Sequence, residues 1–510
     1  MTNILDQKPR RSWSESAKAF LNPKVLALLF LGFSAGVPIL LVFSTLSIWL
    51  REAGVERATI GFFSWAALAY GFKFLWSPLI DKLPLPILAR VLGQRRSWLL
   101  VAQISVILAL SFMALTDPLH NLMAMALGAV FLAFGSATQD IVIDAYRIEC
   151  ADDDLQGIMS ATYIAGYRLG MIVAGAGSLE IAGFLNVIDG YEYTAWKYTY
   201  LSMAAVMGVG IITTLLIAEP KPKTSPSQTL NKASDYGRFI ALFVLTATMF
   251  IFVFTIWPGW AQAMSHVAGP GLASFLDTAL RLMFATFTAL AMGVVLVRFG
   301  MVKREIAIAA YVAPFADFFS RFGRTAILIL LLIATFRIAD IVMGVMANVF
   351  YVDMGFEKQE IGRITKGFGL AATICGGLIG GLVTVRYGII KTLFLGGFLA
   401  AATNVLFAFM STMGPEIFVL MGVIAADNLA GGIASAAFVA YLSSLTSHKF
   451  TATQYALFSS IMMLLPKLIA GYSGVVVDSL GYMQFFLGTA ALGVIPLVMI
   501  VAIAKSSPPE

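Results

Sequence analysis

The chain alternates long apolar runs with short polar breaks along most of its length. An α-helix needs roughly 20 apolar residues to cross a bilayer core, and these runs have that length rather than the alternating pattern of barrel strands. The pattern predicts fourteen transmembrane helices, near residues 24–50, 58–80, 97–116, 121–146, 156–184, 196–218, 237–263, 269–298, 325–352, 359–385, 389–412, 416–444, 452–476 and 481–504.

The polar breaks divide these spans into six, two and six. A linker rich in Pro, Ser and Lys follows the sixth span, and an amphipathic stretch at 303–320 follows the eighth. Such a linker is typical of a flexible connection outside the membrane. The predicted organisation begins with a cytoplasmic N-terminal segment (1–23), a six-helix bundle (24–218) and a cytoplasmic linker (219–236). Two inserted helices (237–298), an amphipathic cytoplasmic connector (299–324), a second six-helix bundle (325–505) and a tail (506–510) follow.

Composition supports an all-α integral membrane protein. The 510 residues are 59% hydrophobic and 12% charged, against roughly 25% charged in an average soluble domain. The polar, basic N-terminal segment lacks the features of a cleavable signal. Two cysteines and three scattered histidines have no metal-site spacing, so we expect neither a metal nor a cofactor.

The basic residues orient the chain. With the N-terminus in the cytoplasm, 23 of the 34 Lys and Arg residues fall on the cytoplasmic side, six outside and five within spans. This bias follows the positive-inside rule and predicts that both termini are cytoplasmic. The same rule accounts for the sequence pI near 9.1, so we expect a lipid bilayer and no nucleic acid as partner.

An internal repeat relates the two six-helix blocks. "AGVERATIG" at 53–61 and "MGFEKQEIG" at 354–362 each follow the first helix of a block, and the two copies share Gly, Glu, Ile and Gly at a spacing of 301 residues. Both copies are predicted on the same side of the membrane, so the blocks are parallel repeats about an axis along the membrane normal. This arrangement is the plan of the major facilitator superfamily, with the middle two helices inserted.

The fourth predicted span ends in a polar sequence, "GSATQDIVIDAYRIE" at 135–149. A carboxylate near a bilayer centre costs about 3 kcal/mol, so such groups persist where a cavity or a partner receives them. Asp140 and Asp144 are four residues apart on one helical face, and Arg147 lies one turn further. Gln139 points about 100° away. The stretch is therefore a candidate site.

Depth in the membrane divides these residues between two interpretations. Asp144 and Arg147 lie near the predicted cytoplasmic surface, where they would brace the neighbouring basic loop. Gln139 and Asp140 lie deeper and combine an amide that can hydrogen-bond a sugar or peptide with a carboxylate that can change protonation state. The candidate cytoplasmic gate comprises Asp81, Arg95, Arg96 and Arg147.

Ionisable residues in other spans either pair locally to stabilise the bundle or form part of a functional site. Arg337 and Asp340 are three residues apart on the first helix of the second block, where both interpretations apply. Asp427 and Asn428 have no oppositely charged neighbour within a turn. The candidate counter-charges to the carboxylates of the fourth span are Lys73 and Arg168.

Several long motifs resemble one known family. "FGSATQDIVIDAYRIE", "YRLGMIVAGAG", "GFSAGVPILLVFSTLSIWLREAGV" and "DNLAGGIASAAFVAYLSSLTSHKFTATQYALF" are similar to the AmpG-type muropeptide permeases of the major facilitator superfamily, over most of residues 25–500. That family imports N-acetylglucosaminyl-1,6-anhydro-N-acetylmuramyl peptides from the periplasm with the proton gradient, for cell-wall recycling. The resemblance implies the same cargo, a bacterial inner-membrane location and no cofactor besides the gradient. We expect a monomer.

The resemblance also assigns roles to residues. The residues that match the family's motifs are Gln139 and Asp140 of the "QD" motif, Asp144, and the first-helix glycines Gly32 and Gly36. A sugar carrying a peptide carboxylate would attract cations, and protonated carboxyls would balance the charge. The substrate-binding candidates are Gly32, Gly36, Lys73, Gln139, Arg168, Arg337 and Asn428. The proton-coupling candidates are Asp140, Asp144, Asp340 and Asp427.

Three positions depart from the family pattern. Arg337 stands where lysine is expected, Asp427 stands where glutamate is expected, and Pro466-Lys467 stands near an expected arginine. Each departure keeps the charge but changes the reach of the side chain, which affects the coupling path.

Two further interpretations keep the membrane fold. The same fold could carry another cargo, such as a sugar conjugate, a siderophore or an acyl-CoA, or it could belong to a non-transporting membrane assembly factor. A membrane enzyme is disfavoured, because the sequence contains no set of nucleophile, base and orienting group, no metal cluster and no phosphate loop.

Overall fold

The structure is a computed structural model of the full chain, and it consists of helices and connecting segments. It describes residues 18–55, 63, 68–150, 155–186, 191–220, 233–260, 263–264, 270–356, 358–470 and 473–506. Within these ranges there is no strand. Most of the predicted N-terminal segment and linker, part of the span predicted at 58–80 and much of the first repeat copy lie outside the described residues.

The N-terminal bundle contains long helices interrupted by short irregular turns. Its helices are α2 (Pro23–Val42), α3 (Ser44–Glu52), α5 (Leu68–Phe72), η2 (Lys73–Leu75), α6 (Ser77–Lys82), α7 (Leu88–Leu92), α8 (Gln94–Ala114), α9 (Leu122–Cys150), α10 (Gln156–Ile172), η4 (Val173–Gly177), α11 (Ser178–Leu185), α12 (Tyr193–Val206) and α13 (Gly208–Leu216).

The inserted helices and the connector follow as α14 (Ala233–Ile256), α16 (Pro270–Arg298), α17 (Arg304–Ala307), η5 (Ile308–Val312) and α18 (Ala313–Phe322). The C-terminal bundle contains α19 (Thr325–Thr335), α20 (Ile338–Asp353), α21 (Lys358–Ile361), η6 (Gly362–Phe368), α22 (Gly369–Tyr387), α23 (Ile389–Met410), α24 (Ile417–Leu445), α25 (Thr451–Ala470) and α26 (Ser473–Ser506). Gly481, at φ 81°, breaks α26 where the last span is predicted to begin.

Twelve helical segments in the described part are long and apolar enough to cross a membrane. The all-α membrane fold predicted from the sequence is therefore confirmed. Two predicted spans are not among the twelve. Only short helices of the span at 58–80 are described, and the span at 452–476 corresponds to α25 and the start of α26. The fourteen-helix arrangement stays a prediction.

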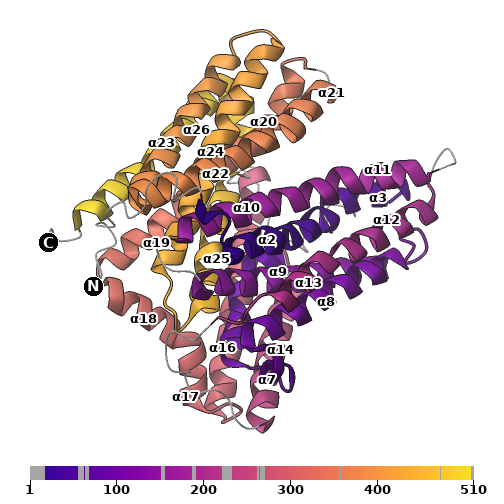
Figure 1. Ribbon diagram of the computed structural model, residues 1–510, viewed down its shortest axis with the longest axis vertical. Coiled ribbons are helices and arrows are strands. Elements are labelled where there is room, and N and C mark those ends of the chain that lie inside the picture. The colour runs from indigo at the N-terminus through magenta and orange to yellow at the C-terminus, as the bar shows by residue number, and fades with distance from the viewer. Residues whose placement is uncertain are drawn as a thin grey trace.

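The two bundles meet at one end and diverge at the other, as Figure 1 shows. One buried apolar cluster draws all its members from residues 37–207, and another draws all of them from 338–486. Both clusters lie toward the loops at 115–121 and 411–416, which we call the divergent end. At the opposite end, around residues 81–95 and 443–455, Ala452 and Ala456 of α25 pack with α6 and α9. We call this the closed end.

The predicted repeat is visible in the backbone. Gly54 and Gly355, 301 residues apart, both have positive φ, 80° and 92°, just after α3 and α20. The following amides make equivalent bonds, from Val55 N to the Leu50 carbonyl and from Phe356 N to the Tyr351 carbonyl. Glycine is favoured at such a helix C-terminus because it adopts positive φ without a Cβ penalty.

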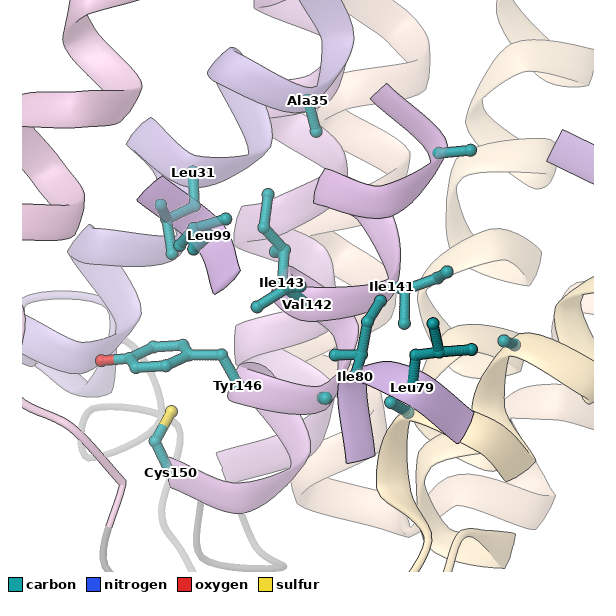
Figure 2. Close-up of a cluster of buried hydrophobic side chains, with 14 of the residues drawn as sticks. Leu31, Ala35, Leu79, Ile80, Leu99, Ile141, Val142, Ile143, Tyr146 and Cys150 are labelled. Atoms are coloured by element: carbon teal, nitrogen blue, oxygen red, sulfur yellow. The ribbon is translucent and has the colours of Figure 1, made fainter. Parts of the chain in front are cut away.

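Apolar packing sets the rotation of α9. Figure 2 shows Ile141, Val142 and Ile143 of α9 among side chains of α2, α6 and α8, including Ile80 and Leu99. The three α9 side chains are at most 1% exposed, so rotating the helix would remove them from this core. The orientation of Asp140, Asp144 and Arg147 is consequently fixed by their apolar neighbours in the sequence.

Candidate functional site

Asp144 lies at the centre of a buried charged cluster. Its Oδ1 accepts a hydrogen bond from Arg147 Nη2 at 3.2 Å, and its Oδ2 is 3.9 Å from Lys73 Nζ. The three side chains are between 0% and 9% exposed. Charges so deeply buried persist only when they are paired, because removing one partner leaves an uncompensated charge. The structure thus brings Lys73, predicted as a counter-charge, to Asp144.

Asp140 lies one turn from Asp144 on the same face of α9. The residue is 8% exposed, and its Oδ1 has no hydrogen-bond partner among the described residues. Tyr70, Tyr163 and Tyr167 lie close enough to interact electrostatically with its carboxylate. An incompletely paired carboxyl among aromatic side chains is less well stabilised than Asp144, and proton uptake would relieve its charge.

Arg168 and Arg337 bring positive charge to the boundary between the bundles. Arg168 belongs to α10, Arg337 lies between α19 and α20, and the two guanidinium groups interact unfavourably. Arg337 Nε is 3.3 Å from Asp340 Oδ2, and its Nη1 donates to Ser435 Oγ. An anion between two facing arginines would remove their repulsion. The arrangement is therefore suited to an anionic ligand.

The remaining C-terminal candidates lie within their own bundle. Asp427 Oδ1 accepts a hydrogen bond from Thr403 Oγ1 at 3.0 Å. The carboxylates of Asp427 and Asp340 are close enough to interact electrostatically. Asn428 Oδ1 accepts from Thr373 Oγ1 at 2.7 Å. The Asn428 bond ties α24 to α22 and leaves this amide oxygen satisfied.

Gln139, Gly32 and Gly36 are placed differently from the charged candidates. Gln139 is fully buried inside the N-terminal bundle, where its Oε1 faces the Ser34 hydroxyl at 3.5 Å. A Cβ on Gly32 would lie 2.2 Å from the carbonyl oxygen of Tyr163, and one on Gly36 would lie 2.0 Å from that of Tyr167. The two glycines therefore allow α2 and α10 to touch through their backbones.

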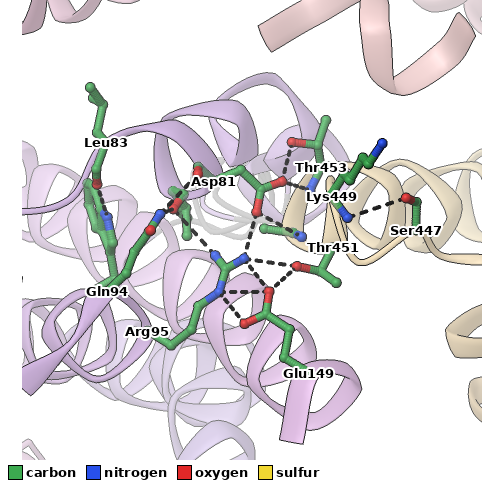
Figure 3. Close-up of polar contacts among 12 residues, drawn as sticks. Asp81, Leu83, Gln94, Arg95, Glu149, Ser447, Lys449, Thr451 and Thr453 are labelled. Carbon is green, nitrogen blue, oxygen red and sulfur yellow. Dashed lines mark hydrogen bonds and ion pairs between the residues drawn. The ribbon is translucent and has the colours of Figure 1, made fainter. Parts of the chain in front are cut away.

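Arg95 is the centre of a polar network at the closed end, shown in Figure 3. Its guanidinium donates to Asp81 Oδ1 at 2.8 Å, to both oxygens of Glu149, and to Thr451 Oγ1 at 2.9 Å. Glu149 also accepts a hydrogen bond from the Thr451 hydroxyl. Thr451 belongs to the C-terminal bundle and the other three residues to the N-terminal one, so the network ties the bundles together.

Asp81 also binds the first turn of α25. Its carboxylate accepts hydrogen bonds from the backbone N–H groups of Ala452 and Thr453, at 3.2 and 2.8 Å, and from Thr453 Oγ1 at 2.7 Å. The first N–H groups of a helix have no partner within the helix, and the helix dipole favours a negative charge there. Asp81, in the opposite bundle, supplies both the hydrogen-bond acceptor and the negative charge.

Arg147 makes a second contact between the bundles. Its Nη1 donates to Ser443 Oγ at 2.6 Å, and its guanidinium lies 5.1 Å from the centre of the Tyr455 ring. The same side chain holds Asp144, so the buried charged cluster and the closed end share one residue. Of the predicted gate residues, Asp81, Arg95 and Arg147 each contact the C-terminal bundle, and Asp81 and Arg95 also bind each other.

Arg96 points elsewhere, toward the C-terminus of α13. It donates to the carbonyls of Thr214 and Leu215 at 3.0 and 2.7 Å. In return, the Glu219 carboxylate accepts from the backbone N–H groups of Arg95 and Arg96 at 2.8 and 3.0 Å. Burial raises the pKa of Glu219, although these two N–H groups favour its charged form. Arg96 and Glu219 therefore anchor the start of α8.

Sequence reasoning missed five contributors to the closed end. Three of them carried a signal: the "TAT" at 451–453, which contains Thr451 and Thr453, is a helix N-terminal pattern, and Glu149 ends the polar stretch of α9. Ser443 and Glu219 carried none, because their partners lie far away in the sequence. The missed residues are Glu149, Glu219, Ser443, Thr451 and Thr453.

Solved structures with the same fold are transporters. The chain resembles the proton:xylose symporter XylE, with a TM-score of 0.58, 11% identity and coverage of 98% of this chain and 97% of the other. It also resembles FucP in the outward conformation, with a TM-score of 0.60, 10% identity and coverage of 95% and 99%. The fold is that of the major facilitator superfamily.

Sequence relatives define the family more narrowly. Putative transporter AmpG 4 of Rickettsia conorii is 30% identical over 475 residues, covering 93% of this chain and 95% of the relative. The anhydromuropeptide permease of Escherichia coli K12 is 30% identical over 488 residues, covering 96% and 81%. A family profile described as acetyl-coenzyme A transporter 1 matches residues 24–255. The chain belongs to the AmpG family of permeases, as its motifs predict.

Family membership fixes the broad function. The relatives are permeases and transporters, so this protein is a multi-pass membrane transporter and not an enzyme.

Proposed function

We propose that the protein imports N-acetylglucosaminyl-1,6-anhydro-N-acetylmuramyl peptides from the periplasm into the cytoplasm for peptidoglycan recycling. The observation that carries this proposal is the 30% identity to an anhydromuropeptide permease over 96% of the chain. The proposed location is the bacterial inner membrane. The protein needs no cofactor, because the proton gradient supplies the energy.

The facing arginines suit this cargo. An anhydromuropeptide carries peptide carboxylates, and its sugar rings present hydroxyl groups and apolar faces. Arg168 and Arg337 would bind a carboxylate from opposite bundles, while Tyr163 and Tyr167, 6.1 Å apart between ring centres, would contact the sugars. Aromatic rings and arginines are well suited to this combination of groups.

Protons would be carried by the buried carboxyl groups. Asp140 is the principal candidate because one of its oxygens lacks a partner among the described residues, and Asp144, Asp340 and Asp427 are the others. A membrane potential provides about 2.3 kcal/mol per charge per 100 mV, equivalent to roughly fifty-fold accumulation per proton. Coupling follows if the cargo and the proton are bound only together.

Transport would proceed by alternating access, in which two rigid bundles rock about a central site. We place both termini in the cytoplasm and fourteen helices in the membrane as six, two and six. The closed end is then the cytoplasmic gate, and the divergent end faces the periplasm. This conformation would receive cargo from outside, and release inside requires the Asp81 and Arg95 contacts to break.

Uptake into proteoliposomes tests the proposal. Wild-type protein should accumulate purified anhydromuropeptide when the lumen is alkaline and negative, and collapse of the gradient should stop accumulation. Asp140→Asn should abolish accumulation, a loss of about fifty-fold per 100 mV, whereas the exposed control Asp478→Asn should retain it. Absence of uptake by the wild type would contradict the proposed cargo. Gradient-driven uptake by Asp140→Asn at normal expression would contradict the proposed role of Asp140 in proton coupling.

Acyl-CoA is the second candidate cargo. The match of residues 24–255 to the acetyl-coenzyme A transporter profile favours it, and the phosphates of coenzyme A would also suit the facing arginines. Competition in the same vesicles separates the two cargoes. Excess acetyl-CoA should leave anhydromuropeptide uptake unchanged if the first proposal is correct.

A further inference from the structure

The connector between the inserted helices and the C-terminal bundle changes direction at a glycine on each side. Gly300 has φ 76° and Gly323 has φ 53°, and a Cβ added to either glycine would meet no other atom within 4 Å. The membrane-crossing segments end at Arg298 and begin again at Thr325. The intervening α17, η5 and α18 are therefore tethered to the same membrane surface at both ends.

The inner face of this connector packs on the protein. Ala310, Pro314 and Phe318 are buried, and the Phe318 ring lies 5.2 Å from the ring of Phe458 in α25. Gln454 Nε2 donates to the Pro314 carbonyl at 2.8 Å. These contacts fix the rotation of the connector, so its outer face has a defined set of residues.

The outer face is apolar although it is exposed. Ile308, Val312, Phe315 and Phe319 are between 40% and 53% exposed, and their spacing of four, three and four residues forms one stripe. Phe299, before the first glycine corner, is 86% exposed. An amphipathic helix that presents such a stripe beside basic residues is typical of a helix lying in the membrane interface.

Basic side chains flank the stripe at both glycine corners. Arg298, Lys303 and Arg304 lie at the first corner and Arg324 at the second, all of them exposed. None of the four has an ion pair within the described residues, whereas Arg321 pairs with Asp317 at 2.9 Å. Basic residues near a membrane surface attract anionic lipid headgroups, each strengthening binding about five-fold.

We infer that the outer face of the α17–α18 connector is a binding surface for anionic phospholipid, with Ile308, Val312, Phe315 and Phe319 in the interface and the four basic residues on the headgroups. The surface goes beyond cargo transport and does not depend on which cargo is carried. Its assignment to the cytoplasmic leaflet rests on the proposed topology. Lipid bound here would hold the connector against the start of α25, which forms the closed end.

Native mass spectrometry of the full-length protein tests headgroup binding. Phosphatidylglycerol and phosphatidylcholine with the same acyl chains are titrated onto detergent-purified protein. Wild-type protein should retain phosphatidylglycerol preferentially. The variant R298Q/K303Q/R304Q/R324Q should lose at least about tenfold in retention. The matched control K391Q/K505Q, at two exposed basic residues elsewhere, should bind as wild type does.

Spin labelling tests whether the stripe lies in lipid. The exposed Cys375 is replaced by serine and the buried Cys150 is kept, so that a label on Phe315→Cys is selective. In phosphatidylglycerol bilayers the label should be accessible to oxygen and protected from a water-soluble nickel complex. Equal phosphatidylglycerol retention by the wild type and the quadruple variant, or full exposure of the label to nickel, would overturn the inference. Neither experiment measures cargo uptake, so a failure of the transport proposal can be distinguished from a failure of the lipid-binding inference.

Discussion

The closed and divergent ends of the molecule are held by different forces. At the closed end the bundles are joined by polar contacts centred on Arg95 and Asp81, together with the apolar packing of Ala452 and Ala456 on α6 and α9. At the divergent end each bundle has its own apolar cluster, within residues 37–207 or 338–486. Polar contacts can be exchanged for water with little net cost, whereas separating apolar helices within a bilayer loses the van der Waals packing that holds them together.

This difference indicates where the molecule can move. In the proposed alternating access, the apolar clusters keep each bundle rigid while the contacts between the bundles open and close. Figure 1 shows the corresponding shape, with the bundles joined at one end only. In the proposed mechanism, the polar contacts of Arg95 and Asp81, which we call the lock, have to favour this conformation and still be reversible.

Arg95→Gln should have the largest effect on the lock. Arg95 is 8% exposed and pairs with both Asp81 and Glu149, so its loss removes the guanidinium that both carboxylates bind. Breaking a buried pair costs about 3–5 kcal/mol, and the closed end should open. The change is measured as a longer distance between spin labels at Arg90 and Lys449. Lys391→Gln is the control, and an unchanged distance in Arg95→Gln would refute the role of Arg95.

Asp81→Asn should have the next largest effect. The substitution removes the charge that accepts bonds from Arg95 and from the first turn of α25, but it leaves Glu149 to pair with Arg95. A loss of about 3 kcal/mol would shift the conformational equilibrium roughly a hundredfold. The same label pair reports it, and an opening larger than that of Arg95→Gln would reverse the proposed ranking.

Thr453→Val should weaken the lock slightly. It removes the hydroxyl that donates to Asp81 and retains the backbone N–H bond to the same carboxylate. One hydrogen bond contributes about 1 kcal/mol, or roughly a five-fold shift in the equilibrium. Thr412→Val, at the divergent end, is the matched control and should leave the label distance as it is in the wild type.

Tyr191→Phe should have the smallest effect and should spare the lock. Burial opposes ionisation of Asp117, yet hydrogen bonds from Tyr191, the Leu119 N–H and His120 hold the pKa of Asp117 below its ordinary value. This stabilisation is present above the unfolded pKa, about 3.9, and is lost as the pH falls through the folded pKa. The melting temperature of the variant should be slightly below that of the wild type at pH 7, and this difference in melting temperature should shrink in acid. A difference that grew in acid would contradict this sign.

Local sequence patterns predicted the fold and part of the site. Apolar run length predicted the helices, and spacing along α9 placed Asp144 beside Arg147 and turned Gln139 away from them. The bond between Asp81 and Thr453 joins residues 372 positions apart, and a one-dimensional pattern does not encode such a distance. The same limit applies to Glu219, whose carboxylate reaches α8 across the bundle.

A paired distance measurement at the two ends tests alternating access most directly. One label pair lies at Arg90 and Lys449 of the closed end, and the other at Leu119 and Glu416 of the divergent end. With anhydromuropeptide and a proton gradient present in liposomes, the first distance should lengthen as the second shortens. If both distances stay constant while uptake proceeds, or if both ends open together, the proposed mechanism is contradicted.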